Sequence, residues 1–192
     1  MTIPSKQPPT VHVRASRPLP ALEGDHWIES LRDGTRVLVR PLRPEDRERE
    51  EDFIRRLSPE ARRFRFFCDF KEPSQSLLDE LMHVDYTREM AFVALVHDDG
   101  HLREIGVSRY ATVDDGQQCE CAITVADDWR HRGLAVLLMQ HLVEVARKQG
   151  LTRMFTTEDP ANEAMRDLAV HLGFRCQAEP DDPRLVRYTL EL

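Results

Sequence analysis

Hydrophobic and polar positions along the chain follow two periods, which separate the expected strands from the expected helices. Segments with the alternating or continuous apolar pattern of strands are 35–42, 90–97, 104–113, 118–126, 152–157, 174–178 and 185–190. Segments with helical spacing or helix-start signals are 44–57, 59–66, 74–83, 132–149 and 161–172. Segment 132–149 carries the longest apolar stripe, and Gly150 ends it. This order predicts an α+β fold with an antiparallel meander over 90–126 and a βαβ crossover after it.

The first 27 residues lack this periodicity, and five of the twelve prolines lie there. A segment that buries so little apolar surface cannot offset the entropy of ordering it. We therefore expect residues 1–27 to form a flexible, proline-rich tail and residues 28–192 to form one domain.

Composition narrows the classes of function. The net charge of −7 argues against a general nucleic-acid binder, whose electrostatic footprint is usually a basic face. The longest uncharged run, 133–143, is shorter than the about 20 apolar residues of a membrane span. Because the N-terminus also lacks the layout of a secretion signal, we expect a cytoplasmic protein with no membrane or nucleic-acid partner. The four cysteines lack the paired spacing of zinc ligands, so no metal is expected.

Residues 125–135 (VADDWRHRGLA) join an expected strand to the longest expected helix. A helix N-terminus presents unpaired N–H groups and a partial positive charge, and therefore attracts anions. Gly133 lets a phosphate approach the backbone without a Cβ, Ala135 is nearly as small, and Arg130 and Arg132 add positive charge. The segment indicates a diphosphate site, although taken alone an ordinary capping loop explains it at least as well.

Glu120 lies within an apolar strand. Alternation places it on one face with Ala122 and Thr124, and places Cys119 and Cys121 on the other face. A carboxylate in such a strand is costly unless it has a partner or a task. It is either a catalytic group, a solvent-facing side chain on a half-exposed sheet, or the ion-pair partner of an arginine.

Together these residues resemble the GNAT superfamily of acyl-CoA-dependent N-acyltransferases, over about residues 35–192. Arg130, Gly133 and Ala135 match that family's phosphate motif, Q/R-x-x-G-x-G/A. The family's downstream helix motif, N-x-x-A/M-x-x-L-x-x-x-x-G-F, is matched by Asn162, Met165, Leu168, Gly173 and Phe174. The resemblance implies the GNAT fold, with a mixed, mostly antiparallel sheet flanked by helices.

A closer likeness is to the catalytic domain of the Pat-type bacterial protein lysine acetyltransferases. It is carried by RPLRPED (40–46), LSPEARRFRFF (57–67), VDYTREMAFVALV (84–96), IGVSRY (105–110) and ECAITVADDWRHRGLA (120–135). It implies transfer of an acetyl group from acetyl-CoA to the ε-amino group of protein lysines, with acyl-CoA synthetases among the acceptors. We expect a monomer or a weak homodimer.

The resemblance also implies roles for individual residues. The expected contacts of acetyl-CoA are Arg130, His131, Arg132, Gly133, Leu134, Ala135 and Asn162. The Val125 N–H would stabilise the oxyanion. Glu120 would be the general base, directly or through water, and burial would strengthen it as a base. Asp85 and Tyr86 would line the acceptor cleft. Ala169 stands where many relatives carry a tyrosine acid, so the proton donor to the leaving thiolate is unassigned.

Two other functions stay open at this point. One is a GNAT acetyltransferase for a small-molecule amine, which turnover against small amines and a protein acceptor would separate from a protein acetyltransferase. The other is a non-catalytic acyl-CoA-binding regulatory protein. Glu120 argues against the second, because a protein that only binds needs no base.

Overall fold

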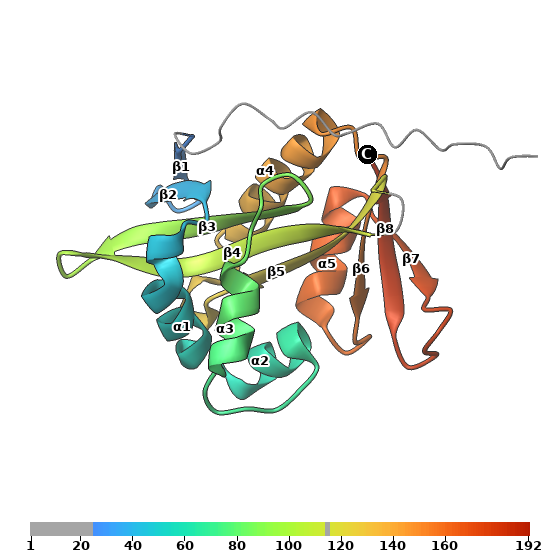
Figure 1. Ribbon diagram of the computed structural model, residues 1–192, viewed down its shortest axis with the longest axis horizontal. Coiled ribbons are helices and arrows are strands. Elements are labelled where there is room, and N and C mark those ends of the chain that lie inside the picture. Colours follow the sequence, from blue (N-terminus) through green and yellow to red (C-terminus); the bar gives the residue numbers. More distant parts are fainter. Residues whose placement is uncertain (1–24, 114–115) are drawn as a thin grey trace, which may run out of the picture.

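The computed structural model describes residues 25–113 and 116–192. Within these residues, eight strands form one sheet in the order β1-β2-β3-β4-β5-β6-β8-β7 (Figure 1). The strands are β1 (Trp27–Ser30), β2 (Arg36–Pro41), β3 (Glu89–Asp98), β4 (His101–Val113), β5 (Gln118–Val125), β6 (Arg153–Glu158), β7 (Arg175–Ala178) and β8 (Val186–Glu191). All neighbouring strands are antiparallel except β5 and β6, which are parallel. The expected mixed, mostly antiparallel sheet is confirmed.

The α-helices of the described chain lie on both faces of this sheet. They are α1 (Arg47–Arg56), α2 (Pro59–Phe66), α3 (Gln75–Met82), α4 (Leu134–Lys148) and α5 (Glu163–Leu172). Two short 3-10 helices are also present in the described chain. Helix η2 (Pro44–Asp46) precedes α1, and η3 (Asp127–Trp129) precedes the loop into α4. Ser58, Ser74 and Asn162 accept hydrogen bonds from first-turn N–H groups, which explains where α2, α3 and α5 begin. No side chain caps α4, whose N-cap residue is Gly133.

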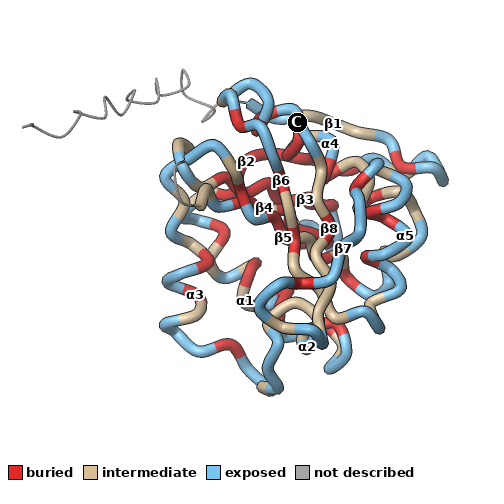
Figure 2. Tube along the Cα trace, turned by 90° about the vertical axis from the view of Figure 1, so that its right-hand side faces the viewer, coloured by how far each residue is buried: buried red, intermediate tan, exposed pale blue. Residues whose placement is uncertain are grey.

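The centre of the sheet is buried on both faces. Figure 1 shows helices on either side of the sheet, and Figure 2 shows buried positions along its central strands. In β3, Phe92 and Ala94 belong to the core beneath α4 and α5, whereas Val93 and Leu95 belong to the core beneath α1, α2 and α3. A strand that is covered on both sides has no polar face. This explains why the segment 90–97 is a continuous apolar run rather than an alternating one.

Two predicted boundaries are corrected by the structure. Trp27 belongs to β1 and packs edge-on against Phe92, with 5.8 Å between ring centroids, so the domain includes it. The helix predicted from Arg132 begins at Leu134, because Gly133 has a φ of +89° and cannot be part of a helix. The strand at 27–30 was not predicted, since it is too short to show alternation. The proposed tail falls mainly on residues 1–24, which lie outside the described residues. Among the described helices, none is both long and apolar enough to cross a membrane.

Candidate active site

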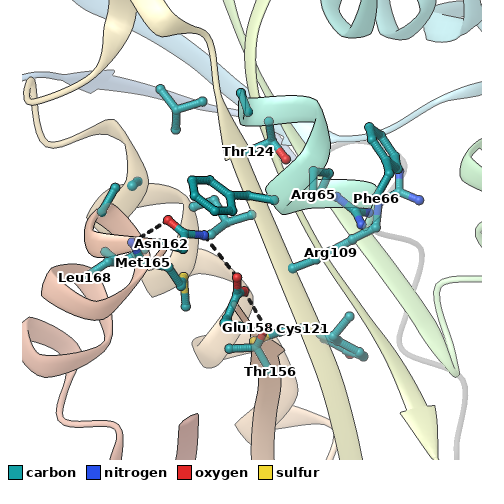
Figure 3. Close-up of a pocket in the computed structure, with 18 of the residues that line it drawn as sticks. Arg65, Phe66, Arg109, Cys121, Thr124, Thr156, Glu158, Asn162, Met165 and Leu168 are labelled. Carbon is teal, nitrogen blue, oxygen red and sulfur yellow. Dashed lines mark hydrogen bonds between the residues drawn. The ribbon is translucent and has the colours of Figure 1, made fainter. Parts of the chain in front are cut away.

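A large cleft opens where β5 and β6 separate. The two strands pair over residues 118–120 and 153–155 and diverge beyond them. The cleft has a volume of about 1380 Å³. Its walls are the diverging strands, α2 and the N-terminal ends of α4 and α5, and Figure 3 shows its interior. Pockets for drug-sized ligands typically have about 300–1,000 Å³, so this cleft has room for a long ligand and part of a second one.

The edge of β5 that faces the cleft is not paired by another strand. The Ala126 N–H donates to the Ile105 carbonyl of β4 at 2.9 Å. Because successive N–H groups of a strand point to opposite sides, the N–H groups of Val125 and Ile123 point away from β4, toward the opening. An extended ligand can therefore hydrogen-bond to this edge as an added strand would. The predicted oxyanion donor, Val125, lies in the cleft wall.

The loop before α4 exposes its backbone to the cleft. His131 and Gly133 have positive φ values of 63° and 89°, and both line the cleft together with Leu134 and Ala135. Such left-handed residues turn backbone N–H groups toward one side and form an anion-binding concavity. The first turn of α4, which no side chain caps, adds further N–H groups. The loop therefore has the backbone geometry of a phosphate site.

The predicted phosphate-binding arginines are already paired within the chain. Arg130 forms an ion pair with Asp127 at 2.8 Å, and Arg132 forms one with Asp33 at 3.2 Å. Arg130 lines the cleft, whereas Arg132 is not among the residues of the cleft wall and stacks over the Trp129 ring at 4.7 Å. The positive charge near the loop is thus partly neutralised by neighbouring carboxylates.

Arg32 is a cation beside this loop that the sequence did not indicate. A Cβ added to Gly133 would lie 3.3 Å from its Nε, and Arg32 also lines the cleft. Its backbone N–H donates to the Arg132 carbonyl at 3.3 Å, which ties the β1–β2 turn to the loop. Nothing in the local sequence around Arg32 points to this contact, because the two segments are far apart along the chain.

Glu120 lies in the cleft wall on the sheet face covered by α2. Cys119 and Cys121 are buried in the core on the opposite face, so the predicted alternation is confirmed. The expectation that Glu120 is buried is wrong: its side chain is exposed, because the cleft opens beside it. Within the described residues Glu120 forms no hydrogen bond or ion pair, so the ion-pair interpretation is not supported. Its carboxylate is available to a ligand.

Glu158 is a second carboxylate of the cleft, at the end of β6, and no sequence motif indicated it. Asn162 Nδ2 donates to Glu158 Oε2 at 3.0 Å, and Thr156 Oγ1 donates to Oε1 at 2.9 Å (Figure 3). Asn162 Oδ1 also accepts from the Met165 N–H at 3.2 Å. The amide of Asn162 therefore caps α5 and positions Glu158. Burial raises the pKa of Glu158, although both hydrogen bonds oppose this shift.

Two arginines line the side of the cleft formed by α2 and β4 (Figure 3). Desolvation and the charge of Arg109 lower the pKa of Arg65 to about 10, so it stays protonated at neutral pH. Arg109 Nη2 donates to the Leu81 carbonyl at 3.1 Å and lies 3.8 Å from Glu50 Oε1. No sequence motif indicated either arginine, because α2 and β4 meet only in the folded chain.

Asp85 and Tyr86 are not among the described residues that line the cleft. Asp85 Oδ1 accepts three backbone hydrogen bonds, from Thr87 at 2.8 Å, Arg88 at 2.7 Å and Glu89 at 2.9 Å. The Tyr86 hydroxyl donates to the Leu42 carbonyl. Both side chains organise the turn before β3, and we leave them out of the acceptor site.

Among the described residues, no group of three or more His, Cys, Asp or Glu side chains is placed to hold a metal ion.

Three features of the cleft fit a transferase whose long donor carries phosphates, as acyl-CoA does. They are the unpaired edge of β5, the backbone of the loop before α4, and the carboxylate of Glu120. A family model described as "Acetyltransferase (GNAT) family" matches residues 51–174. The chain belongs to this family and is an N-acetyltransferase. GNAT acetyltransferases use acetyl-CoA, which agrees with the features of the cleft.

Comparison with individual proteins supports the same assignment. The chain is 57% identical over 172 residues to acetyltransferase PA5475 of Pseudomonas aeruginosa, covering 90% of this chain and 92% of that protein. It is 30% identical over 146 residues to acetyltransferase Pat of Mycolicibacterium smegmatis, covering 74% of this chain but 42% of Pat. The crystal structure of the GNAT domain of S. lividans PAT matches with a TM-score of 0.80 and 26% identity, over 87% of this chain and 97% of that domain. The predicted fold and the resemblance to the Pat catalytic domain are confirmed.

Proposed function

We propose that this enzyme transfers the acetyl group of acetyl-CoA to the ε-amino group of lysine side chains in proteins, acyl-CoA synthetases among them. The observation that carries the proposal is the free carboxylate of Glu120 in a cleft whose other wall is an unpaired strand edge. Support for a lysine acceptor comes from the likeness to the Pat catalytic domain.

In this proposal the donor binds along the opening between β5 and β6. Its diphosphate lies against the backbone of the loop at 130–135, and its pantetheine arm pairs with the edge of β5. The Val125 N–H then donates to the thioester oxygen and stabilises the negative charge that develops there during attack. The volume of the cleft leaves space for an acceptor side chain beside Glu120.

Glu120 supplies the base that an amine acceptor needs. A lysine has a pKa near 10.4, so removing its proton at pH 7 costs about 5 kcal/mol. The exposed carboxylate takes this proton directly or through one water molecule. Its negative charge also attracts the lysine ammonium into the cleft.

Replacing the base tests this assignment. We expect Glu120→Gln to lower kcat by about 10²–10⁴-fold for a lysine acceptor while acetyl-CoA binding is kept. The matched control is Glu144→Gln, which removes an exposed carboxylate of α4 that pairs with Lys148 at 2.6 Å. Release of CoA measures turnover, and calorimetry measures binding. Full turnover by Glu120→Gln would refute the role of Glu120.

The acceptor class is tested separately with the wild-type protein. We expect CoA release with lysine-containing peptides and with an acyl-CoA synthetase to exceed release with polyamines, amino acids and aminoglycosides. The reverse order would favour an acetyltransferase for small amines. Tight binding of acetyl-CoA without turnover of any acceptor would favour a regulatory binding protein.

A further inference from the structure

The two carboxylates of the cleft lie on opposite faces of the sheet. Glu120 shares its face with Phe155, its direct partner in β6. Glu158 shares the other face with Met154 and Thr156, which are buried toward α4 and α5. The strands have diverged before Glu158, so the opening between them joins the two faces. The opening therefore has one carboxylate on each face of the sheet.

Glu158 is held in place and can carry a proton. Its oxygens accept from Thr156 and Asn162, which leaves the carboxyl group fixed at the cleft wall. Burial raises the pKa of Glu158, and the negative charge of Glu120 raises it further. The two hydrogen bonds and the Arg65 guanidinium lower this pKa, but the net shift is upward. The side chains that act on Glu158 or feel its charge, from all the surrounding elements, are Thr156, Asn162, Cys121, Tyr188, Arg65 and Glu120.

The other proton donors of the cleft wall are less suitable. Burial raises the pKa of the Cys121 thiol and of the Tyr110 hydroxyl, and the Tyr110 hydroxyl is engaged by Gln149. Three histidines also line the cleft: His131 in the loop before α4, His171 in the last turn of α5, and His83 at the end of α3. None of these histidines belongs to the two strands that border the opening. Glu158 lies on β6, which borders the opening.

We propose that Glu158 is the catalytic acid that protonates the sulfur of the departing CoA. The inference rests on the proposed use of acetyl-CoA but not on which amine accepts the acetyl group. It assigns the proton donor that the sequence left open at Ala169.

The proton and electron balance of the step is complete. The amine nitrogen bonds to the carbonyl carbon, and the π electron pair moves to the oxygen. When the carbonyl forms again, the C–S bond breaks and its electron pair stays on sulfur. The O–H proton of Glu158 passes to this sulfur. A lysine ammonium loses two protons in becoming the amide: Glu120 holds the one that is removed before attack, and the second, which is acidic once the C–N bond has formed, passes to bulk water. Transfer of one proton from Glu120 to Glu158 through water then restores both groups.

The test compares Glu158→Gln with Glu120→Gln on two nucleophiles. A lysine peptide arrives protonated and needs a base, whereas hydroxylamine is unprotonated at neutral pH and does not. Both nucleophiles expel the same thiolate. We therefore expect Glu120→Gln to lose activity mainly with the peptide, and Glu158→Gln to lose about 10²-fold with both. Glutamine keeps an oxygen that can accept from Asn162 Nδ2, so α5 should still begin correctly. Calorimetry with acetyl-CoA and thermal melting check this.

The pH dependence separates a proton donor from a structural residue. Glu158 helps only while it holds its proton, so the ratio of wild-type to Glu158→Gln rates should be largest at low pH. The ratio should fall as the pH rises through the pKa of Glu158, which burial raises above its ordinary value. A Glu158→Gln protein with wild-type rates, a ratio that is constant with pH, or a loss explained by weaker acetyl-CoA binding would overturn the inference. A wild-type protein that binds acetyl-CoA but releases no thiol with either nucleophile would instead contradict the proposed function.

Discussion

The phosphate loop yields a sharp prediction at Gly133, where φ is +89°. An L-residue with a Cβ in this left-handed region costs about 1–2 kcal/mol. An added Cβ would lie 3.3 and 3.4 Å from Nε and Cγ of the Arg32 side chain, so this flexible side chain must shift by a few tenths of an ångström. We therefore expect Gly133→Ala to fold, with the free energy of unfolding lowered by about 1–2 kcal/mol. The melting temperature of a chain of this size should fall by about 2–8 °C.

The same substitution should weaken donor binding. Alanine relieves its strain by changing φ, which rotates the N–H groups that the loop presents to the cleft. A hydrogen bond to a charged group contributes about 1.5–3 kcal/mol, so losing one should raise the Kd for acetyl-CoA by about 10–100-fold. Isothermal titration calorimetry with acetyl-CoA and with CoA measures this change directly.

Gly150 provides the matched control at the other end of α4. Its φ is +80° and an added Cβ would meet no atom within 4 Å, so Gly150→Ala carries similar backbone strain away from the cleft. We expect both variants to lose similar stability, with affinity for acetyl-CoA lost in Gly133→Ala alone. Unchanged affinity in Gly133→Ala, or an equal loss in both variants, would refute the assignment of the diphosphate to this loop.

Two further predictions concern buried or structural carboxylates. Asp46 is fully buried and bound by Arg40 at 2.6 and 2.7 Å, so Asp46→Asn should cost about 3–5 kcal/mol in chemical denaturation. Burial opposes ionisation, yet the hydrogen bonds from Arg40 and the Arg43 N–H lower the pKa of Asp46. The contribution of Asp46 to the free energy of unfolding is therefore fully present above about pH 4, and it is lost as the pH falls through the lowered pKa. The Asp46→Asn variant should lack this pH dependence. Asp85→Ala should lower the free energy of unfolding by about 1–3 kcal/mol, because the backbone hydrogen bonds to Asp85 are lost. The KM for the acceptor should stay unchanged. A raised KM at unchanged stability would show that Asp85 belongs to the acceptor site.

Most elements of the fold were predictable because their signals are local. The leucine stripe of α4, the alternation of β5 and the serine caps of α2 and α3 each depend on neighbours within a few residues. The strand β1 was missed because four residues are too few for a period to show. Trp27 in this strand packs against Phe92 and His141, and these contacts form only in the folded chain.

Site residues were predictable where they belong to one continuous sequence motif. Site residues that only the fold brings together were not predictable. Gly133 and Asn162 were found because they belong to continuous motifs, and both line the cleft. Glu158 and Arg65 were missed, since β6 and α2 approach β5 only in the folded chain. Asp85 was placed in the acceptor cleft from a likeness of sequence, whereas its three backbone hydrogen bonds give it a structural task.

The most direct test of the central claim is a crystal structure of the protein with acetyl-CoA. We expect the pantetheine arm to lie between β5 and β6, with the diphosphate on the N–H groups of residues 131–135. The thioester oxygen should lie within hydrogen-bond distance of the Val125 N–H, with Glu120 and Glu158 on either side of the acyl group. A donor bound elsewhere, with this loop and strand edge empty, would contradict the account.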